Sequence, residues 1–219
     1  MAVGDGVRRR YVSPVRDRQA IETRQVILAA AVELFVEAGY AAATVAAVAR
    51  RAEVSTQTVY NAFETKPGLL KAAYDVALAG GDEAVPLADR PEVRALYKLT
   101  DPGGFVRGYA ALGRQVLDRV GPLMLQITAG AAAGDLDLLE HQRTTDAERA
   151  TGTMMVARRV EQLGALAPGL SPERARDRIW TLNSVHVWHL LTTGRGWTGD
   201  EYQDWIGSAM CDAVLTSAP

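Results

Sequence analysis

The sequence predicts an all-α protein. Apolar residues recur at helical spacing along almost all of the 219 residues, strand-like alternation is missing, and glycine or proline stands at nearly every expected joint. The chain is 48% hydrophobic and 23% charged, which is ordinary for a globular protein and excludes a disordered or fibrous one. A chain of this length forms one large domain or two modest ones, each with a buried core.

The first expected element is a helix that begins near Gln19. It follows a basic, aperiodic segment at 8–17, which we expect to belong to a flexible arm over residues 1–18. Gly39 stands where a left-handed residue commonly ends a helix. The apolar side of the helix is one stripe at helical spacing, formed by Ile27, Ala31, Leu34, Phe35 and Ala38.

Two short helices and a longer one are expected next. Thr44 and Ser55 are predicted to cap the short helices, because a hydroxyl oxygen there accepts a bond from a free backbone N–H. A tight link at 52–54 joins the two, and the Lys-Pro-Gly run at 66–68 opens the longer helix. Short helices joined in this way have the layout of a helix-turn-helix.

The rest of the chain is also predicted to be helical. Residues 81–91 contain two prolines among mixed charges, which predicts a loop. Thr198 and Glu201 have the spacing of a capping box at the start of the last helix. The remaining helices are expected, to within a few residues, at 92–99, 104–120, 123–132, 136–163, 173–192 and 200–215.

The helix that begins at Ser55 carries side chains suited to reading DNA. In a helix-turn-helix the second helix of the motif lies in the major groove, where its side chains meet base edges. Glutamine and asparagine pair bidentately with adenine, and threonine contacts a base acceptor or a thymine methyl. The candidates for base contact are Thr56, Gln57, Thr58 and Asn61, and those for phosphate contact are Tyr60 and Lys66. Ser55, at the start of the same helix, is also counted among the DNA-binding residues.

From residue 23 to residue 70 the sequence resembles the DNA-binding domain of the TetR family of transcriptional regulators. Residue type and spacing agree together at Phe35, Gly39, Tyr40, Thr44, Val45, Val54, Ser55, Thr58, Val59, Tyr60, Phe63, Lys66, Leu69 and Leu70. A later stretch, from Arg195 to Trp205, resembles the start of the last helix in an actinobacterial-type branch of that family.

The resemblance implies a homodimeric repressor that binds double-stranded DNA at a palindromic operator and leaves it when a small-molecule effector binds. It implies a DNA-binding domain at 19–71 and a larger helical domain at 72–219 for ligand binding and dimerisation. By position it also implies phosphate contacts from Thr44, Tyr60 and Lys66. Two residues depart from the family pattern: Glu53 replaces the usual glycine, at a cost of about 1 kcal/mol if the backbone is left-handed, and Ala62 replaces a frequent aromatic or histidine.

The last two predicted helices are the expected dimer interface. The helix at 173–192 is apolar on two sides, which predicts burial from two sides, and the last helix has a side of small residues that allows close approach. We expect both helices to pair with their copies in a four-helix interface. The expected contacts are Trp188, Leu191, Tyr202, Gly207, Ser208 and Cys211.

The central helices carry apolar and adaptable residues of the kind that line ligand sites, although cores use the same residues. Asn183, one turn from Trp180, adds a polar group. The candidate ligand-binding residues are Phe105, Tyr109, Leu112, Met124, Met154, Met155, Trp180 and Asn183.

Net charge differs between the two parts of the chain. The whole sequence has a net charge of −2. Residues 1–71 hold ten Lys and Arg against seven Asp and Glu, a net of +3, whereas the remainder holds 14 against 19, a net of −5. This polarity is the one expected if the N-terminal part meets phosphates. The Arg8–Arg10 run fits either a DNA-seeking arm or a solubilising tail.

No cofactor and no metal site is expected. Cys211 is the only cysteine, which excludes an intramolecular disulfide and a thiolate cluster. His186 and His189 have chelating spacing, but a third ligand is not evident, so packed histidines are expected. The run from Gly194 to Gly199 has the letters G-x-G-x-x-G, yet a helical pattern precedes it, which predicts a turn between helices.

Two alternatives remain open. The scaffold could serve as a small-molecule or protein-binding dimer without DNA contact, or as a helical-bundle enzyme that uses His186, His189 or Asp137 with Glu140. Catalytic spacing is not recognisable, which weighs against the enzyme. The N-terminus lacks the apolar stretch of a signal peptide, and glutamates interrupt the longest alanine-rich region. We therefore expect no membrane span and a cytoplasmic location.

Overall fold

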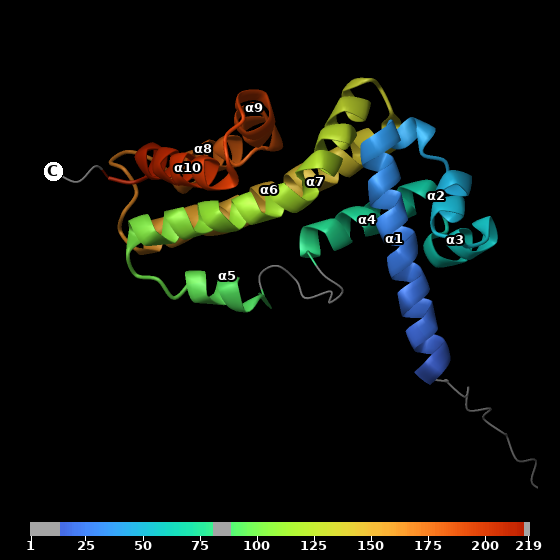
Figure 1. Cartoon of the computed structure of the whole chain (residues 1–219). Coiled ribbons are helices and arrows are strands. Elements are labelled where there is room, and N and C mark those ends of the chain that lie inside the picture. The colour runs from blue at the N-terminus through green and yellow to red at the C-terminus, as the bar shows by residue number, and fades with distance from the viewer. Residues whose placement is uncertain (1–13, 81–88, 217–219) are drawn as a thin grey trace, which may run out of the picture.

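A small helical head is joined to a long helical body (Figure 1). The computed structural model describes residues 14–80 and 89–216. The head consists of α1 (Pro14–Ala42), α2 (Val45–Arg51), α3 (Thr56–Phe63) and α4 (Lys66–Ala79). The body consists of α5 (Pro91–Leu96), α6 (Pro102–Ala132), α7 (Leu136–Gln162), α8 (Pro172–Leu182), α9 (Val185–Arg195) and α10 (Gly199–Val214). The all-α prediction is confirmed.

The head is built around the apolar side of α1, which packs against α2 and α4. Three residues of the predicted stripe, Ile27, Ala31 and Phe35, are completely buried, whereas Leu34 is half-buried and Ala38 is exposed. By length and composition the Arg18–Ala42 stretch of α1 is apolar enough to cross a membrane. Its buried residues instead form the core of the head, as in many helical domains.

The predicted caps define the two short helices of the head. The hydroxyl of Thr44 accepts a bond from Ala47 N at 3.1 Å, and that of Ser55 accepts one from Thr58 N at 3.0 Å. Between the helices Glu53 has a φ of 55°, the left-handed geometry expected there. Gly39 has a φ of 76° as expected, but its ψ of 162° is not that of a left-handed helical cap, and α1 resumes to Ala42.

The predicted joint near Pro122 is absent, because α6 is one helix of 31 residues with this proline inside it. Proline lacks the N–H that bonds the carbonyl one turn earlier, and it usually breaks or kinks a helix. Here Val120 and Leu123 on either side of it are buried, and the ring of Trp188 packs against Gly121. Packing therefore outweighs the lost hydrogen bond.

The predicted helix at 173–192 is instead two helices, α8 and α9, which meet at Asn183 and Ser184. Ser184 caps α9 by accepting a bond from Val187 N at 3.3 Å. Arg149 from α7 donates to the carbonyl oxygens of Asn183 at 2.8 Å and of Trp180 at 3.3 Å, which otherwise lack helical partners. The residues of the two apolar sides expected on one helix are therefore divided between two helices.

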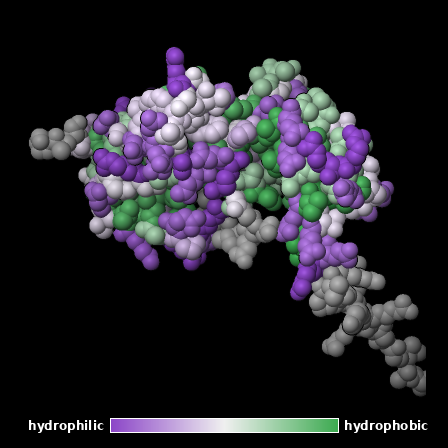
Figure 2. Space-filling model, in the orientation of Figure 1, coloured by the Kyte–Doolittle hydropathy of each residue, from purple (hydrophilic) through white to green (hydrophobic). Residues whose placement is uncertain are grey.

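The long helices α6 and α7 pack against each other and form the spine of the body, with α10 on α6 and α8 on α7. On the face drawn in Figure 2, hydrophilic residues cover much of this body, and apolar residues gather where it meets the head. The expected domain boundary after residue 71 falls inside α4. The Arg8–Arg10 run and most of the expected 81–91 loop lie outside the described residues.

Candidate functional site

Helix α3 has one buried and one exposed side. Val59 and Phe63 are 1% and 7% exposed and point into the head. Thr56, Gln57, Tyr60 and Asn61 are exposed, so the structure brings these four expected DNA-contacting residues onto one outer surface. Gln57 Nε2 donates to Asn61 Oδ1 at 2.8 Å, which holds the two amides side by side. The exposed side is therefore a row of short hydrogen-bonding side chains.

Two of the predicted DNA-binding residues, Ser55 and Thr58, serve the helix itself. Ser55 caps α3, and its hydroxyl also lies 2.8 Å from that of Thr58, which is half-buried. At the other end of α3, Arg24 from α1 stacks 4.3 Å above the ring of Phe63 and donates to Ala62 O at 3.0 Å. The Ser55 contacts fix the start of α3, and the Arg24 contacts fix its end relative to α1.

Lys66, expected to meet phosphate, is directed into the protein. Its Nζ donates to the carbonyl oxygens of Tyr40 and Ala41 and lies 4.1 Å above the ring of Tyr40. Burial lowers the pKa of its ammonium group, and the nearby acids Asp135 and Asp137 oppose that effect. The side chain therefore braces the end of α1 against the start of α4. Thr44, a second residue expected to contact phosphate, lies on the link between α1 and α2 and is exposed.

A hydrogen bond joins the head to the body at the same place. Tyr40 Oη, at the end of α1, donates to Asp137 Oδ2, in the first turn of α7, at 3.2 Å. Burial and then the charge of Asp137 raise the pKa of the Tyr40 hydroxyl, so it is a donor at neutral pH. Tyr74 on α4 makes a second contact, an edge-on packing against His141 of α7 at 4.9 Å.

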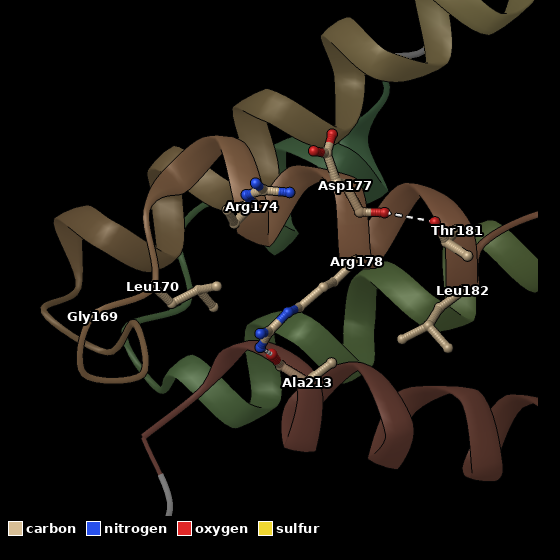
Figure 3. A pocket seen from close by; sticks show the side chains of 8 residues that line it. All are labelled: Gly169, Leu170, Arg174, Asp177, Arg178, Thr181, Leu182 and Ala213. Carbon is tan, nitrogen blue, oxygen red and sulfur yellow. Dashed lines mark hydrogen bonds between the residues drawn. The ribbon is translucent and has the colours of Figure 1, made fainter.

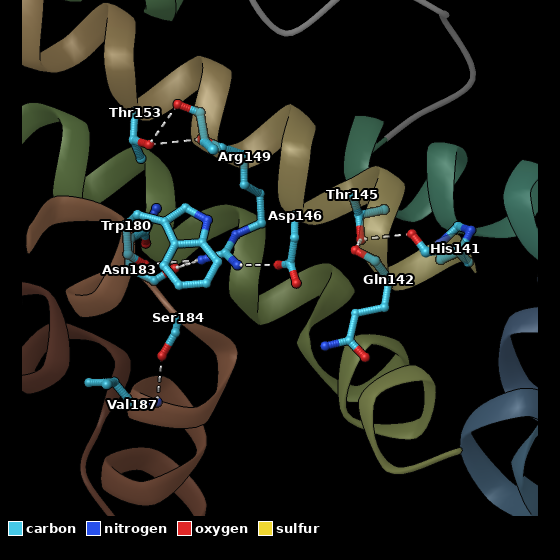
Figure 4. A network of polar contacts seen from close by, with 11 residues as sticks. His141, Gln142, Thr145, Asp146, Arg149, Thr153, Trp180, Asn183, Ser184 and Val187 are labelled. Atoms are coloured by element: carbon cyan, nitrogen blue, oxygen red, sulfur yellow. Dashed lines mark hydrogen bonds and ion pairs between the residues drawn. The ribbon is translucent and has the colours of Figure 1, made fainter. Parts of the chain in front are cut away.

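A cavity of about 210 Å³ lies between α4, α6, α7 and the junction of α8 with α9. Figure 4 shows the polar network beside it, in which Arg149 lies between Asp146 and the indole of Trp180. The lining residues are Tyr74, Met124, Ile127, Thr128, Gln142, Thr145, Asp146, Arg149, Trp180, Thr181, Ser184, Val185 and His186. This site contacts the head through α4 alone.

Only two of the predicted ligand-binding residues, Met124 and Trp180, line this cavity. Phe105 is completely buried against Tyr97, and Asn183 donates to the hydroxyl of Tyr109 at 3.2 Å instead. Leu112 and Met154 are half-buried elsewhere, and Met155 is 50% exposed. The polar lining of α7 was missed, although Gln142, Thr145, Asp146 and Arg149 have the i, i+3, i+4, i+7 spacing of one helix face.

A larger hollow of about 670 Å³ is a groove on the outside of α8 and α10 (Figure 3). Its charged residues, Arg174, Asp177 and Arg178, are all exposed, and Arg178 donates to Ala213 O at 2.6 Å. Because the groove is an open surface feature, it is less suited to a small molecule than the more enclosed cavity.

Four of the six expected dimer contacts lie inside the chain's own core, which corrects that prediction. Tyr202 is completely buried, and Trp188 is 9% exposed and donates to Asp118 at 3.1 Å. Gly207 and Cys211 are buried against α6, so the small residues admit a helix of the same chain and not a copy. Ser208 is exposed and Leu191 is half-buried.

The remaining motifs have structural roles. The Gly194–Gly199 run is a turn between α9 and α10, as predicted, in which Gly196 has the left-handed φ of 73°. Thr198 and Glu201 form the predicted capping box at the start of α10. Within residues 14–80 and 89–216, His, Cys, Asp and Glu side chains form no cluster of metal-binding size.

Comparison with known families agrees with this arrangement. Residues 27–73, which include all of α2 and α3, match the family model of bacterial regulatory proteins of the tetR family. No curated protein matches the chain.

Several solved structures share the fold over nearly the whole chain. A protein from Rhodococcus sp. assigned to the TetR family is 16% identical, with a TM-score of 0.68 over 88% of this chain and 98% of that one. NalD, the secondary repressor of the MexAB-OprM multidrug efflux pump in Pseudomonas aeruginosa, is 21% identical, with a TM-score of 0.66 over 93% and 100%. A protein from Saccharomonospora viridis assigned as a transcriptional regulator, in complex with choline, is 16% identical, with a TM-score of 0.66 over 90% and 99%.

Proposed function

Because residues 27–73 place this chain in the tetR family of DNA-binding transcriptional regulators, we propose that it is a homodimeric repressor which a small molecule releases from a palindromic operator. The observation that carries this proposal is α3, whose polar side chains are exposed on one side while Val59 and Phe63 anchor the other. The proposal places the protein in the cytoplasm, with DNA binding at 19–71 and ligand binding and dimerisation at 72–219.

In this proposal Gln57 and Asn61 contact bases, because paired amides one helical turn apart suit the donor and acceptor edge of adenine. Thr56 adds a third base contact. Tyr60, which is 45% exposed, and Thr44 donate to phosphate oxygens. Ser55 and Thr58 hold the start of α3, and Lys66 braces the head, so these three residues act on DNA indirectly.

Binding measurements on two variants separate base reading from phosphate contact. Gln57→Ala should change the preferred base at one position and weaken binding to the preferred site by about 1–3 kcal/mol. Tyr60→Phe should weaken binding to every sequence by about 1 kcal/mol, because it removes a hydrogen bond that carries no sequence information.

Fluorescence anisotropy with labelled duplexes measures both effects. Gln115→Ala, an exposed glutamine change on α6, is the matched control and should bind like the wild type. Unchanged affinity and unchanged base preference in both variants would remove α3 as the reading surface.

The cavity is proposed as the effector site, because helices surround much of it and Tyr74 brings α4 into its wall. The choline complex of a similar structure supports a small molecule in this fold. A ligand that displaces Tyr74 moves α4, and with it the α3 that α4 contacts. Coupling of this kind is typically worth about 1–3 kcal/mol.

The dimer interface is proposed on the outer sides of α8 and α10, since their inner sides are already buried in the chain. Trp205, 40% exposed, lies there with Ser208, Asp204 and Asp212 on α10, and Arg174 and Arg178 lie on the adjacent α8. A two-fold axis would bring these basic and acidic side chains of two copies together. Light scattering should give the mass of a dimer, and a monomer would exclude this interface.

A further inference from the structure

One wall of the cavity is apolar and aromatic. Met124 and Ile127 of α6, which are 8% and 3% exposed, face this space together with Tyr74, Trp180 and Val185. Flat rings pack well against aromatic faces and methionine. The volume of about 210 Å³ exceeds the roughly 150 Å³ of an engineered cavity that binds benzene. The space therefore fits a single six-membered ring with a short substituent.

A polar part of the lining comes from one side of α7. Gln142, Thr145, Asp146 and Arg149 line it at successive turns, as Figure 4 shows for their side chains. The hydroxyl of Thr145 donates to backbone carbonyls of its own helix, at 3.0 and 3.1 Å, and its lone pairs remain acceptors. A ring seated on the apolar wall thus presents its substituent to these groups.

The two charges in this wall neutralise each other. Arg149 Nη1 donates to Asp146 Oδ1 at 3.0 Å, and Nη2 donates to the carbonyl oxygens of Asn183 and Trp180. The guanidinium is thus held by one carboxylate and two fixed dipoles. A charged ligand would lose part of its hydration without gaining an unpaired counter-charge, which is unfavourable in a partly enclosed site.

Two hydrogen-bonding groups of the lining residues are unused within the described chain. Asp146 Oδ2 accepts no bond there, although Oδ1 does. The indole N–H of Trp180 is buried and donates to no protein acceptor. An uncharged ligand that carries a donor, such as a hydroxyl group, has the chemistry to donate to Asp146 Oδ2, and Gln142 offers an amide in the same lining.

We propose that the cavity selects an uncharged, single-ring compound that carries a hydroxyl or amide group close to the ring. This inference rests on the proposed function only in assigning the cavity as the effector site. The Asp146–Arg149 pair sets the selectivity against charged compounds, and the aromatic wall sets the selectivity for a ring.

Isothermal titration calorimetry on the full chain tests this selectivity with four probes of matched size: benzyl alcohol, toluene, benzoate and benzylammonium. Benzyl alcohol should bind at least tenfold more tightly than each of the others. Toluene lacks the hydroxyl, and the two ions lack a free counter-charge. Equal or tighter binding of benzoate or benzylammonium would overturn the proposal, and so would the failure of all four probes to bind.

Two variants and one control assign the binding to this cavity. Ile127→Phe fills the space and should abolish benzyl alcohol binding, whereas Leu136→Ala, at a residue that is 77% exposed, should leave it unchanged. Asp146→Asn leaves the charge of Arg149 unpaired, so benzoate should gain at least tenfold relative to benzyl alcohol. Benzyl alcohol binding that survives Ile127→Phe would overturn the assignment.

Operator binding is measured separately, so the two proposals fail in different ways. Selective benzyl alcohol binding that leaves operator affinity unchanged supports the ligand class and contradicts effector-driven release. Normal operator binding by a protein that binds none of the probes supports the DNA-binding role and overturns the ligand class.

Discussion

At the scale of single residues, a few side chains hold geometries that cost the fold free energy. Glu53 has a left-handed φ of 55° in the turn between α2 and α3, where a residue with a Cβ is disfavoured by about 1 kcal/mol. The residue is exposed, so its side chain contributes little packing in return.

Glu53→Gly should therefore raise the free energy of unfolding by roughly 0.5–1 kcal/mol, because glycine adopts this conformation without strain. Urea denaturation measures the change. Glu148→Gly, at an exposed position inside α7, is the matched control and should lower stability by about 1 kcal/mol. Equal destabilisation by both glycines would show that the turn is not strained.

His141 makes stability depend on pH, because burial lowers the pKa of its imidazole below the ordinary 6.5. The unfolded chain then binds a proton that the folded chain does not. The contribution of the neutral His141 ring to the free energy of unfolding is fully present above pH 6.5, the pKa in the unfolded chain. This contribution is lost as pH falls through the lower pKa of the folded chain.

His141→Phe keeps a ring against Tyr74 and cannot titrate. The free energy of unfolding should therefore fall further between pH 7.5 and pH 5.5 for the wild type than for the variant. Parallel losses in the two proteins would exclude His141 as the source of the pH dependence.

At the scale of helices, the capped N-terminal ends can be predicted from the sequence more easily than the positions where a long helix is interrupted. Caps at Thr44, Ser55 and Thr198 follow from local hydrogen bonding, which the nearby sequence determines. The continuity of α6 through Pro122 depends on packing against distant helices. The break at Asn183 and Ser184 contains neither glycine nor proline. Arg149 from α7 stabilises it by donating to the carbonyl oxygen of Asn183.

The same distinction applies to the candidate site. The exposed row on α3 could be predicted, because one short helix determines which side is apolar. The direction of Lys66 could not, since carbonyl oxygens at the end of α1 take up its donors. The cavity was only partly predicted, because its walls come from helices that are far apart in sequence.

The contact between α1 and α7 is directly testable. Tyr40→Phe removes the hydrogen bond to Asp137 but keeps the ring under Lys66. It should lower the free energy of unfolding by about 1 kcal/mol. Tyr97→Phe is the control, because the hydroxyl of Tyr97 forms no hydrogen bond within the described residues, and it should change stability little. Equal effects of the two changes would mean that the Tyr40 bond contributes nothing.

At the scale of the whole molecule, the uneven charge of the chain fits its proposed division of labour. The net of +3 over residues 1–71, which includes the Arg8–Arg10 run, would attract DNA to the N-terminal part of the chain, and the net of −5 over the remainder would keep the rest from binding it non-specifically. Two heads held by one dimer would read two half-sites, so the geometry of the body sets the spacing that an effector alters.

Selection of bound sequences from random DNA by the full-length protein tests this account most directly. We predict an inverted repeat whose half-sites lie on one side of the duplex, about one helical turn or a multiple of it apart. Gln57→Ala should change the selected base at the symmetry-related position in both half-sites. Enrichment of a sequence without two-fold symmetry, or of no sequence at all, would contradict a dimer that reads DNA through α3.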